Sequence, residues 1–257
     1  MGGEVKPVAF VGYECSGALR SRLAALGFDA YSADLKPAED DGLGTHLVMD
    51  VFRAYEWLKR NRLDPVVAVF HPDCTYLTNS AAWAFNEPDF HRYPGVGYHQ
   101  KLKPGTLTGN DRRLARLAAL IEVQRLWRRE SPGKGRENPR GALSTLWRKP
   151  TQSVQPYMFG DDASKETCLW IDGADPLPLP QRSQWVKPRL VPRAKALGKS
   201  DLAKASTGPE FMPRWANQTD TGQNRLSPGE QRATDRARTY PGIADALARH
   251  LAQTAGL

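Results

Sequence analysis

The sequence predicts an α/β protein built on a mostly parallel central sheet. In the first 70 residues, short apolar runs alternate with segments of helical periodicity, which is the pattern of repeated strand and helix units. The apolar runs are continuous, as in strands that are buried on both faces. With 257 residues, the chain is long enough to bury one sizeable core. We therefore expect one main domain with additions to it.

Three strands and two helices are expected in this first part of the chain. The strands are predicted at residues 7–12, 28–34 and 66–70, which are short apolar runs. The helices are predicted at residues 17–26, which are followed by a glycine, and at residues 52–60. Because parallel strands need crossover connections, an alternation of strands with helices indicates that the strands run parallel.

A polar loop and two further helices follow. Residues 86–110 are rich in proline and glycine, and this stretch is long enough to be a functional loop. Residues 111–129 predict a long basic amphipathic helix, and residues 236–252 predict a closing helix. The chain is thus expected to consist of a core at residues 1–171, a reduced recognition or linker segment rich in proline and basic residues at 172–228, and a C-terminal helix that returns to the core at 229–257.

Composition limits the class of protein. Hydrophobic residues make up 40% and charged residues 25% of the chain, which is ordinary for a globular protein, and no segment reaches the length of a membrane-spanning helix. We expect a cytoplasmic location. Cys15, Cys74 and Cys168 are spaced too widely for a paired zinc site or a disulfide framework, so free thiols and no metal are expected. A formal charge of +8 favours a polyanionic partner.

A candidate cofactor loop follows the first predicted strand at residues 10–17 and contains two glycines. The carboxyl ends of parallel strands are where nucleotide-like cofactors bind, although a simple tight turn gives the same pattern. The G-x-G-x-x-G fingerprint is missing, which disfavours a dinucleotide cofactor. Asp34 and Asp50 end two further apolar runs, where their carboxylates could accept hydrogen bonds from ribose hydroxyls and from an adenine amino group. Both could equally be helix caps.

A candidate nucleophile, Cys74, comes shortly after the predicted strand at 66–70, and Pro72 stiffens the turn between them. A thiol in this place is held and reachable, although a lone cysteine is more often a small buried apolar residue. Glu137 lies in a second conformationally restricted turn, residues 135–139, beyond the long helix.

Four segments resemble, in order, the motifs of DNA cytosine carbon-5 methyltransferases of the compact phage-encoded type. They are the cofactor loop at residues 10–17, the nucleophile loop at 72–74, the Glu-Asn motif at 137–139 and the C-terminal helix at 240–246. Residues 155–160 and 165–170 are also similar to the phage-type pattern, so the resemblance spans nearly the whole chain.

The resemblance implies a Rossmann-like methyltransferase fold with a reduced or absent target-recognition domain, S-adenosyl-L-methionine as cofactor and duplex DNA with a flipped cytosine as partner, in the host cytoplasm if the chain is phage-encoded. The expected catalytic residues are Cys74, Glu137 and Asn138. The expected cofactor-binding residues are Phe10, Gly12, Glu14, Ser16, Gly17, Asp34, Asp50 and Pro72. The expected substrate-binding or DNA-binding residues are Thr78, Lys165, Arg112 and Arg116.

The nucleophile loop departs from the family pattern at two positions. Asp73 stands in place of a second proline, and Thr75 in place of the glutamine of the wider family. A carboxylate beside a thiol disfavours the thiolate, so Asp73 has to point away or be neutralised by a basic neighbour. The Gln-x-Arg-x-Arg motif of the wider family has no clear counterpart, and Lys165 is the candidate replacement.

Two other functions stay open at this stage. One is a methyltransferase of the same fold that acts on a free pyrimidine nucleotide or on RNA, because the shortened recognition region does not define the substrate. The other is a DNA-binding relative without catalytic activity, against which the presence of Cys74 and Glu137 argues.

Overall fold

The computed structural model describes residues 5–78, 82–89, 91, 105–128, 134–139, 141–197, 208–226, 235 and 237–257. For Trp83, Arg128 and residues 134–139 it describes the backbone alone.

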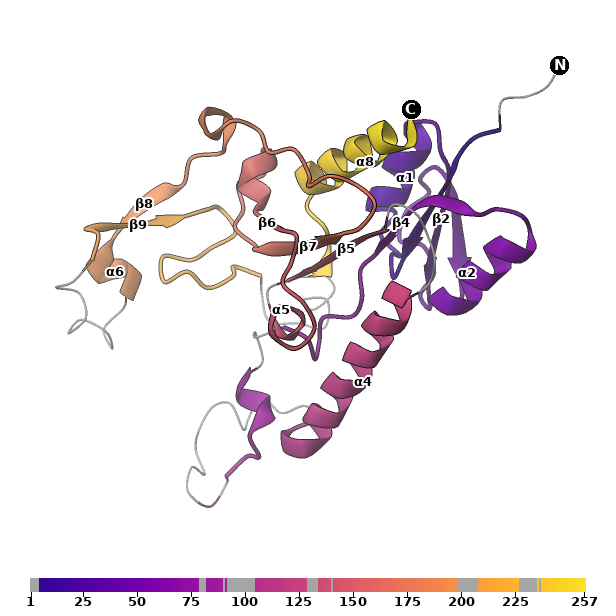
Figure 1. Cartoon of the computed structure of the whole chain (residues 1–257). Coiled ribbons are helices and arrows are strands. Elements are labelled where there is room, and N and C mark those ends of the chain that lie inside the picture. Colours follow the sequence, from indigo (N-terminus) through magenta and orange to yellow (C-terminus); the bar gives the residue numbers. More distant parts are fainter. Residues whose placement is uncertain are drawn as a thin grey trace.

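The core of the structure is a seven-stranded sheet in the order β3-β2-β1-β4-β5-β7-β6 (Figure 1). Its strands are β1 (Val8–Gly12), β2 (Asp29–Asp34), β3 (Thr45–Val48), β4 (Pro65–Phe70), β5 (Lys134–Pro139), β6 (Gln152–Val154) and β7 (Thr167–Ile171). Neighbouring strands from β3 to β5 are all parallel, whereas β7 is antiparallel to both β5 and β6. The expected α/β class with a mostly parallel sheet is therefore confirmed.

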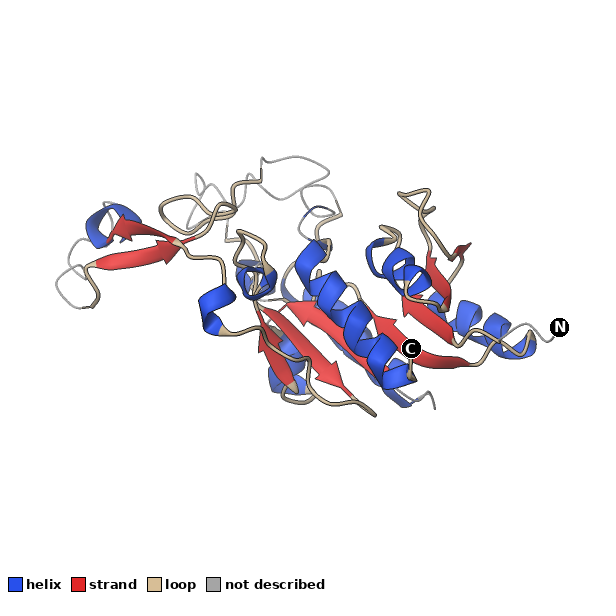
Figure 2. Cartoon of the chain, turned by 90° about the horizontal axis from the view of Figure 1, so that it is seen from above, coloured by secondary structure: helices blue, strands red, loops and turns tan. Residues whose placement is uncertain are grey.

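The central strands are buried on both faces because helices cover each side of the sheet (Figure 2). Along β1, Ala9 and Val11 pack into one hydrophobic cluster, and Phe10 between them packs into another. The first cluster contains residues of α1 (Ala18–Ala25) and α8 (Pro241–Ala255), and the second contains residues of α2 (Val51–Arg60) and α4 (Gly109–Arg128). This arrangement explains the continuous apolar runs of the sequence, because both faces of each strand meet a helix layer.

Three local predictions differ from the structure. The strand β3 was not predicted, because its four residues alternate between partly buried and exposed positions and lack a continuous apolar run. The backbone at residues 135–139, expected to turn, is instead the strand β5. The last helix begins at Pro241 rather than at residue 236, because proline lacks an N–H and is favoured in the first turn of a helix.

The described residues between 172 and 226 include a second, smaller sheet, whereas Leu177 near the start of this stretch packs into the core. The strands β8 (Arg189–Pro192) and β9 (Phe211–Arg214) form their own antiparallel sheet, followed along the chain from β8 by α6 (Arg193–Leu197). We call β8, α6 and β9 the arm. In Figure 1 the arm lies at one side of the molecule, away from α2 and the amino terminus. Hydrogen bonds from Lys195 and Arg189 lower the pKa of Asp220 to about 2 and tie the arm to the loop after β9.

An aromatic stack attaches the arm to the core. The ring of Tyr157, in the short 3-10 helix η2 (Pro156–Phe159), stacks on Trp215 with centroids 4.3 Å apart and an interplanar angle of 12°. Trp185 packs against the same tyrosine ring at 5.7 Å. Ring pairs of this kind contribute beyond their buried area, so the loop after β9 is held against the core near β6 and β7.

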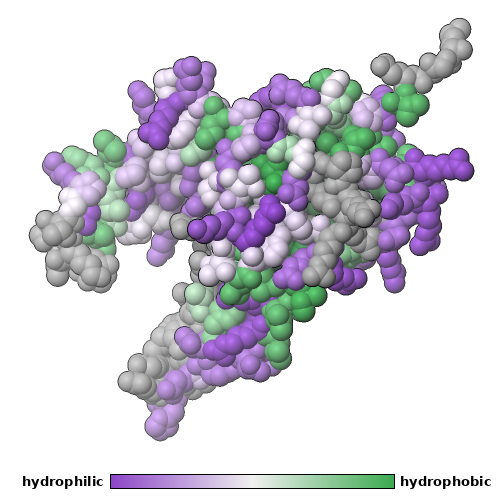
Figure 3. Space-filling model, viewed as in Figure 1, coloured by the Kyte–Doolittle hydropathy of each residue, from purple (hydrophilic) through white to green (hydrophobic). Residues whose placement is uncertain are grey.

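Helix α4 has a mixed surface. Leu114, Leu117 and Ile121 are each at least half exposed along one side of the helix, and hydrophobic side chains are visible there on the molecular surface (Figure 3). The expected basic face is therefore only part of this helix. Within the described ranges, no helix combines the length and the apolar composition that a membrane span requires.

We expect α8 to be essential to the stability of the core. Ile243 is 1% exposed and packs in the cluster shared with α1 and the sheet. Replacing it with alanine removes buried methyl groups and leaves a cavity, so Ile243→Ala should lower the free energy of unfolding by about 2–5 kcal/mol. Urea denaturation checks this, with Arg249→Ala on the exposed side of the same helix as the control. Equal stability of the two variants would contradict the packing role of α8.

Candidate functional site

A cavity of about 1460 Å³ lies at the carboxyl ends of the parallel strands. Its walls come from the residues that follow β1, β2, β3 and β4, from α4, and from the segments around residues 164–166, 217–226 and 235–241. The sheet runs outward from β1 to β3 on one side and from β4 to β5 on the other, so the strand order reverses between β1 and β4. Such a reversal is where open α/β sheets bind their ligands.

Glu14 occupies the amino terminus of α1. Its carboxylate accepts hydrogen bonds from the backbone N–H groups of Leu19 (2.6 Å) and Arg20 (3.2 Å), and the residue is only 5% exposed. Helix amino termini are the usual binding sites for phosphate groups in dinucleotide-binding folds. Because the Glu14 carboxylate already accepts hydrogen bonds from these N–H groups, they are not available to bind a pyrophosphate.

Two glycines of the cofactor loop are required by their surroundings. A Cβ atom on Gly12 would lie 2.6 Å from the ring of Phe70 and 2.8 Å from the Val51 side chain, so both would have to shift. Gly17 has a φ of 69°, which glycine adopts without the steric penalty of other residues. Ser16 completes the loop by accepting a hydrogen bond from Ala18 N at 3.3 Å.

The structure divides the expected cofactor residues into two groups. Glu14, Ser16, Asp34 and Asp50 line the cavity. The side chain of Phe10 is fully buried and meets Phe70 at 5.9 Å and Tyr55 at 6.1 Å between ring centroids, and Pro72 is also buried. Phe10, Gly12, Gly17 and Pro72 are not among the residues that line the cavity. Their place in the structure is to shape the loops that carry the lining residues.

Asp34 and Asp50 stand at the ends of β2 and β3. Asp50 caps α2 by accepting hydrogen bonds from Phe52 N (3.0 Å) and Arg53 N (3.1 Å), which confirms the helix-cap alternative for this residue. Asp34 accepts a hydrogen bond from Lys36 N at 2.9 Å. These bonds use Oδ1 of each carboxylate, and both residues still line the cavity.

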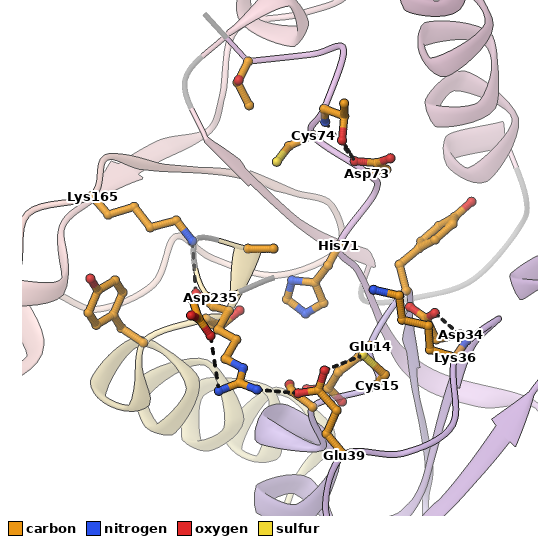
Figure 4. A pocket seen from close by; sticks show the side chains of 18 of the residues that line it. Glu14, Cys15, Asp34, Lys36, Glu39, His71, Asp73, Cys74, Lys165 and Asp235 are labelled. Atoms are coloured by element: carbon orange, nitrogen blue, oxygen red, sulfur yellow. Dashed lines mark hydrogen bonds and ion pairs between the residues drawn. The ribbon is translucent and has the colours of Figure 1, made fainter. Parts of the chain in front are cut away.

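This end of the cavity is acidic. Glu14, Asp34, Glu39 and Asp50 all line it. Burial, and next the charge of Glu39, raise the pKa of the Cys15 thiol to about 11, so this cysteine is protonated at neutral pH and is a poor nucleophile. Figure 4 shows Glu14, Cys15, Asp34 and Glu39 gathered on one side of the cavity, with Cys74 on another.

Cys74 begins a tight turn at the other end of the cavity. Its carbonyl oxygen accepts hydrogen bonds from Leu77 N and Thr78 N, both at 3.0 Å, and both Cys74 and Thr78 line the cavity. On the opposite side of this turn, Ala142 N donates to the carbonyl of Leu77 at 2.6 Å, and Thr78 forms a β-bridge with Gly141. A Cβ atom on Gly141 would overlap that carbonyl, so glycine permits the close approach.

The departures of the nucleophile loop from the family pattern have a structural explanation. Asp73 Oδ1 accepts hydrogen bonds from Thr75 N (2.8 Å) and from Thr75 Oγ1 (2.6 Å). The two unusual residues thus bind one another and close a local Asx turn. In Figure 4 the Asp73 carboxylate and the Cys74 sulfur point away from each other, which is the first of the two solutions that the sequence required.

Arg112 and Arg116 face this turn from α4. Arg112 Nη2 donates to the carbonyl of Thr75 at 3.1 Å, and Arg116 Nε donates to the carbonyl of Tyr76 at 2.8 Å. Arg112 is only 5% exposed and lines the cavity. These hydrogen bonds go to the protein backbone, and the expected contact of both arginines with substrate or DNA stays a prediction.

Lys165 lies on the wall opposite the β-strand ends and donates to the carbonyl of Arg238 at 3.1 Å. Beside it is Asn217, which sequence analysis did not single out. Asn217 donates to Ser164 O (3.0 Å) and to Tyr240 Oη (3.2 Å), and it accepts from Ser164 N. The signal was present as a dense run of Asn, Gln and Thr at residues 217–224, because such side chains order loops through local hydrogen bonds.

The position of Glu137 and Asn138 is given by the backbone, and their side chains lie outside the described part of the structure. In the parallel pairing of β4 with β5, Phe70 is opposite Arg136. Glu137 is therefore level with His71, the first residue after β4, which lines the cavity. The Glu-Asn segment, at the carboxyl end of β5, and the Cys74 loop, which follows β4, thus lie at the same edge of the sheet.

Among the described residues, no group of three or more His, Cys, Asp or Glu side chains could hold a metal ion. No protein-family model matches the sequence, and no curated protein gives a significant match.

Substitution of Asp50 is expected to separate its capping role from any role of its charge. Loss of the cap in Asp50→Ala should lower the free energy of unfolding by about 1 kcal/mol, whereas Asn is as good a cap as Asp and Asp50→Asn should leave stability nearly unchanged. Denaturant titration of both variants measures this. If the two variants lose the same stability, the capping hydrogen bonds do not account for the contribution of Asp50.

Proposed function

We propose that this chain is an S-adenosylmethionine-dependent methyltransferase that modifies carbon 5 of cytosine in DNA, with Cys74 as the nucleophile. The observation that carries the proposal is that one cavity contains both the acidic loops after β1, β2 and β3 and the Cys74 turn after β4. A methyl donor and an acceptor base could thus be held in the same space.

The acidic end of the cavity suits the cofactor that we propose. S-adenosylmethionine has a positively charged sulfonium and amino group, ribose hydroxyls and no phosphate, and when bound it supplies the methyl group. Glu14 at the start of α1 disfavours a phosphate there and favours a cation. Asp34 and Asp50 offer carboxylate oxygens to hydroxyl or amino donors.

The size of the cavity and the sheet order also support the proposal. Sites for single small ligands are commonly about 300–1000 Å³, and about 1460 Å³ leaves room for a base beside a cofactor. An antiparallel β7 inserted between β5 and β6 is, in addition, the strand arrangement typical of Rossmann-like methyltransferases.

In the proposed reaction, the Cys74 thiolate adds to carbon 6 of cytosine, which makes carbon 5 nucleophilic enough to accept a methyl group. Glu137 hydrogen-bonds the ring nitrogen and the exocyclic amine, where charge develops. Loss of the proton from carbon 5 and elimination of the thiolate then release the product. Because neither face of a stacked base is accessible, the cytosine has to leave the duplex to reach Cys74.

Methyl transfer should depend on Cys74 and not on the other accessible thiol. Purified protein is incubated with labelled S-adenosylmethionine and duplex DNA, and the digested nucleosides are identified. We expect 5-methylcytosine from the wild type and from Cys15→Ser, and a loss of at least about a thousandfold in Cys74→Ser, because a hydroxyl is a far weaker nucleophile than a thiolate.

Other outcomes of this assay would redirect or refute the proposal. Label in RNA or in free cytidine nucleotides, with none in DNA, would change the substrate. Cofactor binding without transfer to any of these would favour a non-catalytic relative. Equal activity of Cys74→Ser would refute the covalent mechanism.

Removing the charge of Glu14 should weaken binding of the cofactor. Glu14→Gln keeps a carbonyl oxygen that can accept a hydrogen bond from Leu19 N, but it removes the negative charge. We expect the affinity for S-adenosylmethionine, measured by calorimetry, to fall about tenfold, which corresponds to about 1.4 kcal/mol. Glu210→Gln, an exposed residue on the arm, is the control. Unchanged affinity in Glu14→Gln would contradict an electrostatic role for this carboxylate.

A further inference from the structure

Two arginines on one face of α4 are held in an arrangement that is unfavourable for the fold alone. Arg112 and Arg116 are one helical turn apart, which brings like charges together. Among the described residues, neither forms an ion pair with a carboxylate. Burial, and next the charge of Arg112, lower the pKa of Arg116. Arg112 is buried and Arg116 is partly buried, and removing charges from water without a counter-ion is costly, so packing by itself does not explain two cations at this place.

Both guanidinium groups are fixed in position. The Arg112 guanidinium lies 5.2 Å from the ring centres of Tyr76 and Phe85, and that of Arg116 lies 3.7 Å from the Phe85 ring. Arg112 Nη1 also donates to Leu107 O at 3.4 Å, and its Nε is buried without a hydrogen-bond partner in the described part of the chain. Hydrogen bonds and aromatic rings thus both hold these two side chains against the residues that follow Cys74.

The hydrogen bonds of these arginines converge on the turn that contains Cys74. The carbonyls of Thr75 and Tyr76 accept them from the side of α4, while Ala142 N holds the carbonyl of Leu77 from the side of α5 (Ala142–Leu146). The turn is thus held from two directions. Thr75 directly follows Cys74, so Arg112 binds the peptide next to the cysteine, and both Arg112 and Cys74 line the cavity.

We propose that Arg112 and Arg116 are positioning residues for Cys74, which fix the turn after the thiol and supply the positive charge that favours its thiolate. This inference rests on the proposed function of Cys74 as a nucleophile. The sequence has no clear Gln-x-Arg-x-Arg motif to supply arginines to the site, and this inference assigns the arginines of α4 to the site instead.

The other charged groups around the cavity do not supply this charge in the same way. Besides the carboxylates of the acidic end, the charged or titratable residues that line the cavity include Asp73, His71, Glu122, Lys165 and Glu166. Asp73 is bound to Thr75, and Glu122 on α4 accepts a hydrogen bond from the Tyr13 hydroxyl. Lys165 is bound to the carbonyl of Arg238. The side chains of β5, on the neighbouring strand, lie outside the described residues.

The reactivity of the Cys74 thiol tests the proposal without cofactor or DNA. The full chain is treated with iodoacetamide from about pH 5 to 9, and alkylation of the Cys74 peptide is followed by mass spectrometry, because the rate reports the thiolate fraction. Cys15 is an internal reference, since its raised pKa keeps its alkylation slow at neutral pH. Arg113→Gln is the matched control, because Arg113 is an exposed arginine on the same helix.

Removing the Arg112 charge should move the rate profile of Cys74 to higher pH. A nearby positive charge lowers the pKa of a thiol, so its loss raises the pKa and decreases the thiolate fraction at neutral pH. We expect alkylation near pH 7 to slow by about threefold to tenfold in Arg112→Gln, in the same direction in Arg116→Gln, and not at all in Arg113→Gln. Arg112→Lys, which keeps the charge but loses the planar fork, should fall between wild type and Arg112→Gln.

An unchanged Cys74 profile in a folded Arg112→Gln variant overturns the proposal. Circular dichroism and thermal unfolding establish the fold. If Arg112→Gln does not fold, the other two variants decide. The proposal is then overturned if both Arg112→Lys and Arg116→Gln give the same alkylation profile for Cys74 as the wild type. If the Cys74 thiol responds to Arg112 but the protein transfers no methyl group, the proposed function is refuted and this inference stands. If the protein is an active methyltransferase but its Cys74 thiol does not respond to Arg112, this inference is refuted and the proposed function stands.

Discussion

The parallel pairing of β1 with β4 brings the two halves of the site together. Gly12 at the end of β1 is level with Phe70 at the end of β4, and His71 N donates to the carbonyl of Gly12 at 3.0 Å. The loops that leave these strands therefore start side by side and diverge, one toward α1 and the other toward the Cys74 turn. Glycine at residue 12 leaves room for the Phe70 ring and for Val51, which would both have to move if a Cβ atom were present.

Several charged side chains on the walls of the cavity are the same ones that form hydrogen bonds to backbone groups of helix ends and turns. At the β1 to β3 end, carboxylates satisfy the amino termini of α1 and α2, and the same carboxylates make this end acidic. At the Cys74 end, arginines from α4 satisfy the carbonyls of a turn, and one of them, Arg112, also lines the cavity. Groups that satisfy the backbone thus also place charge on the walls of the cavity, carboxylates at one end and the Arg112 guanidinium at the other.

Local sequence patterns were sufficient to predict those helices and strands whose signal lies in a few consecutive residues. The strands β1, β2 and β4 and the helices α1 and α2 were expected close to where they lie, because continuous apolar runs and helical periodicity are local. The capping role of Asp50 was one of two open alternatives and is confirmed. Residues 135–139 were expected to turn after a short strand, whereas the strand β5 extends through them. Its strand conformation depends on pairing with β4 and β7 rather than on its own Gly, Asn and Pro residues.

The sequence by itself determined the fold class, the loops that follow the strands and the residues that could carry chemistry. Only the tertiary structure decided that these loops line a common cavity, that Asp73 binds Thr75 and points away from Cys74, and that Arg112 and Arg116 face the protein rather than solvent. These relations join residues as far apart as Tyr76 and Arg116, or Ser164 and Asn217. The physical reason is that strand order and helix packing set such contacts, and spacing along the chain carries no information about them.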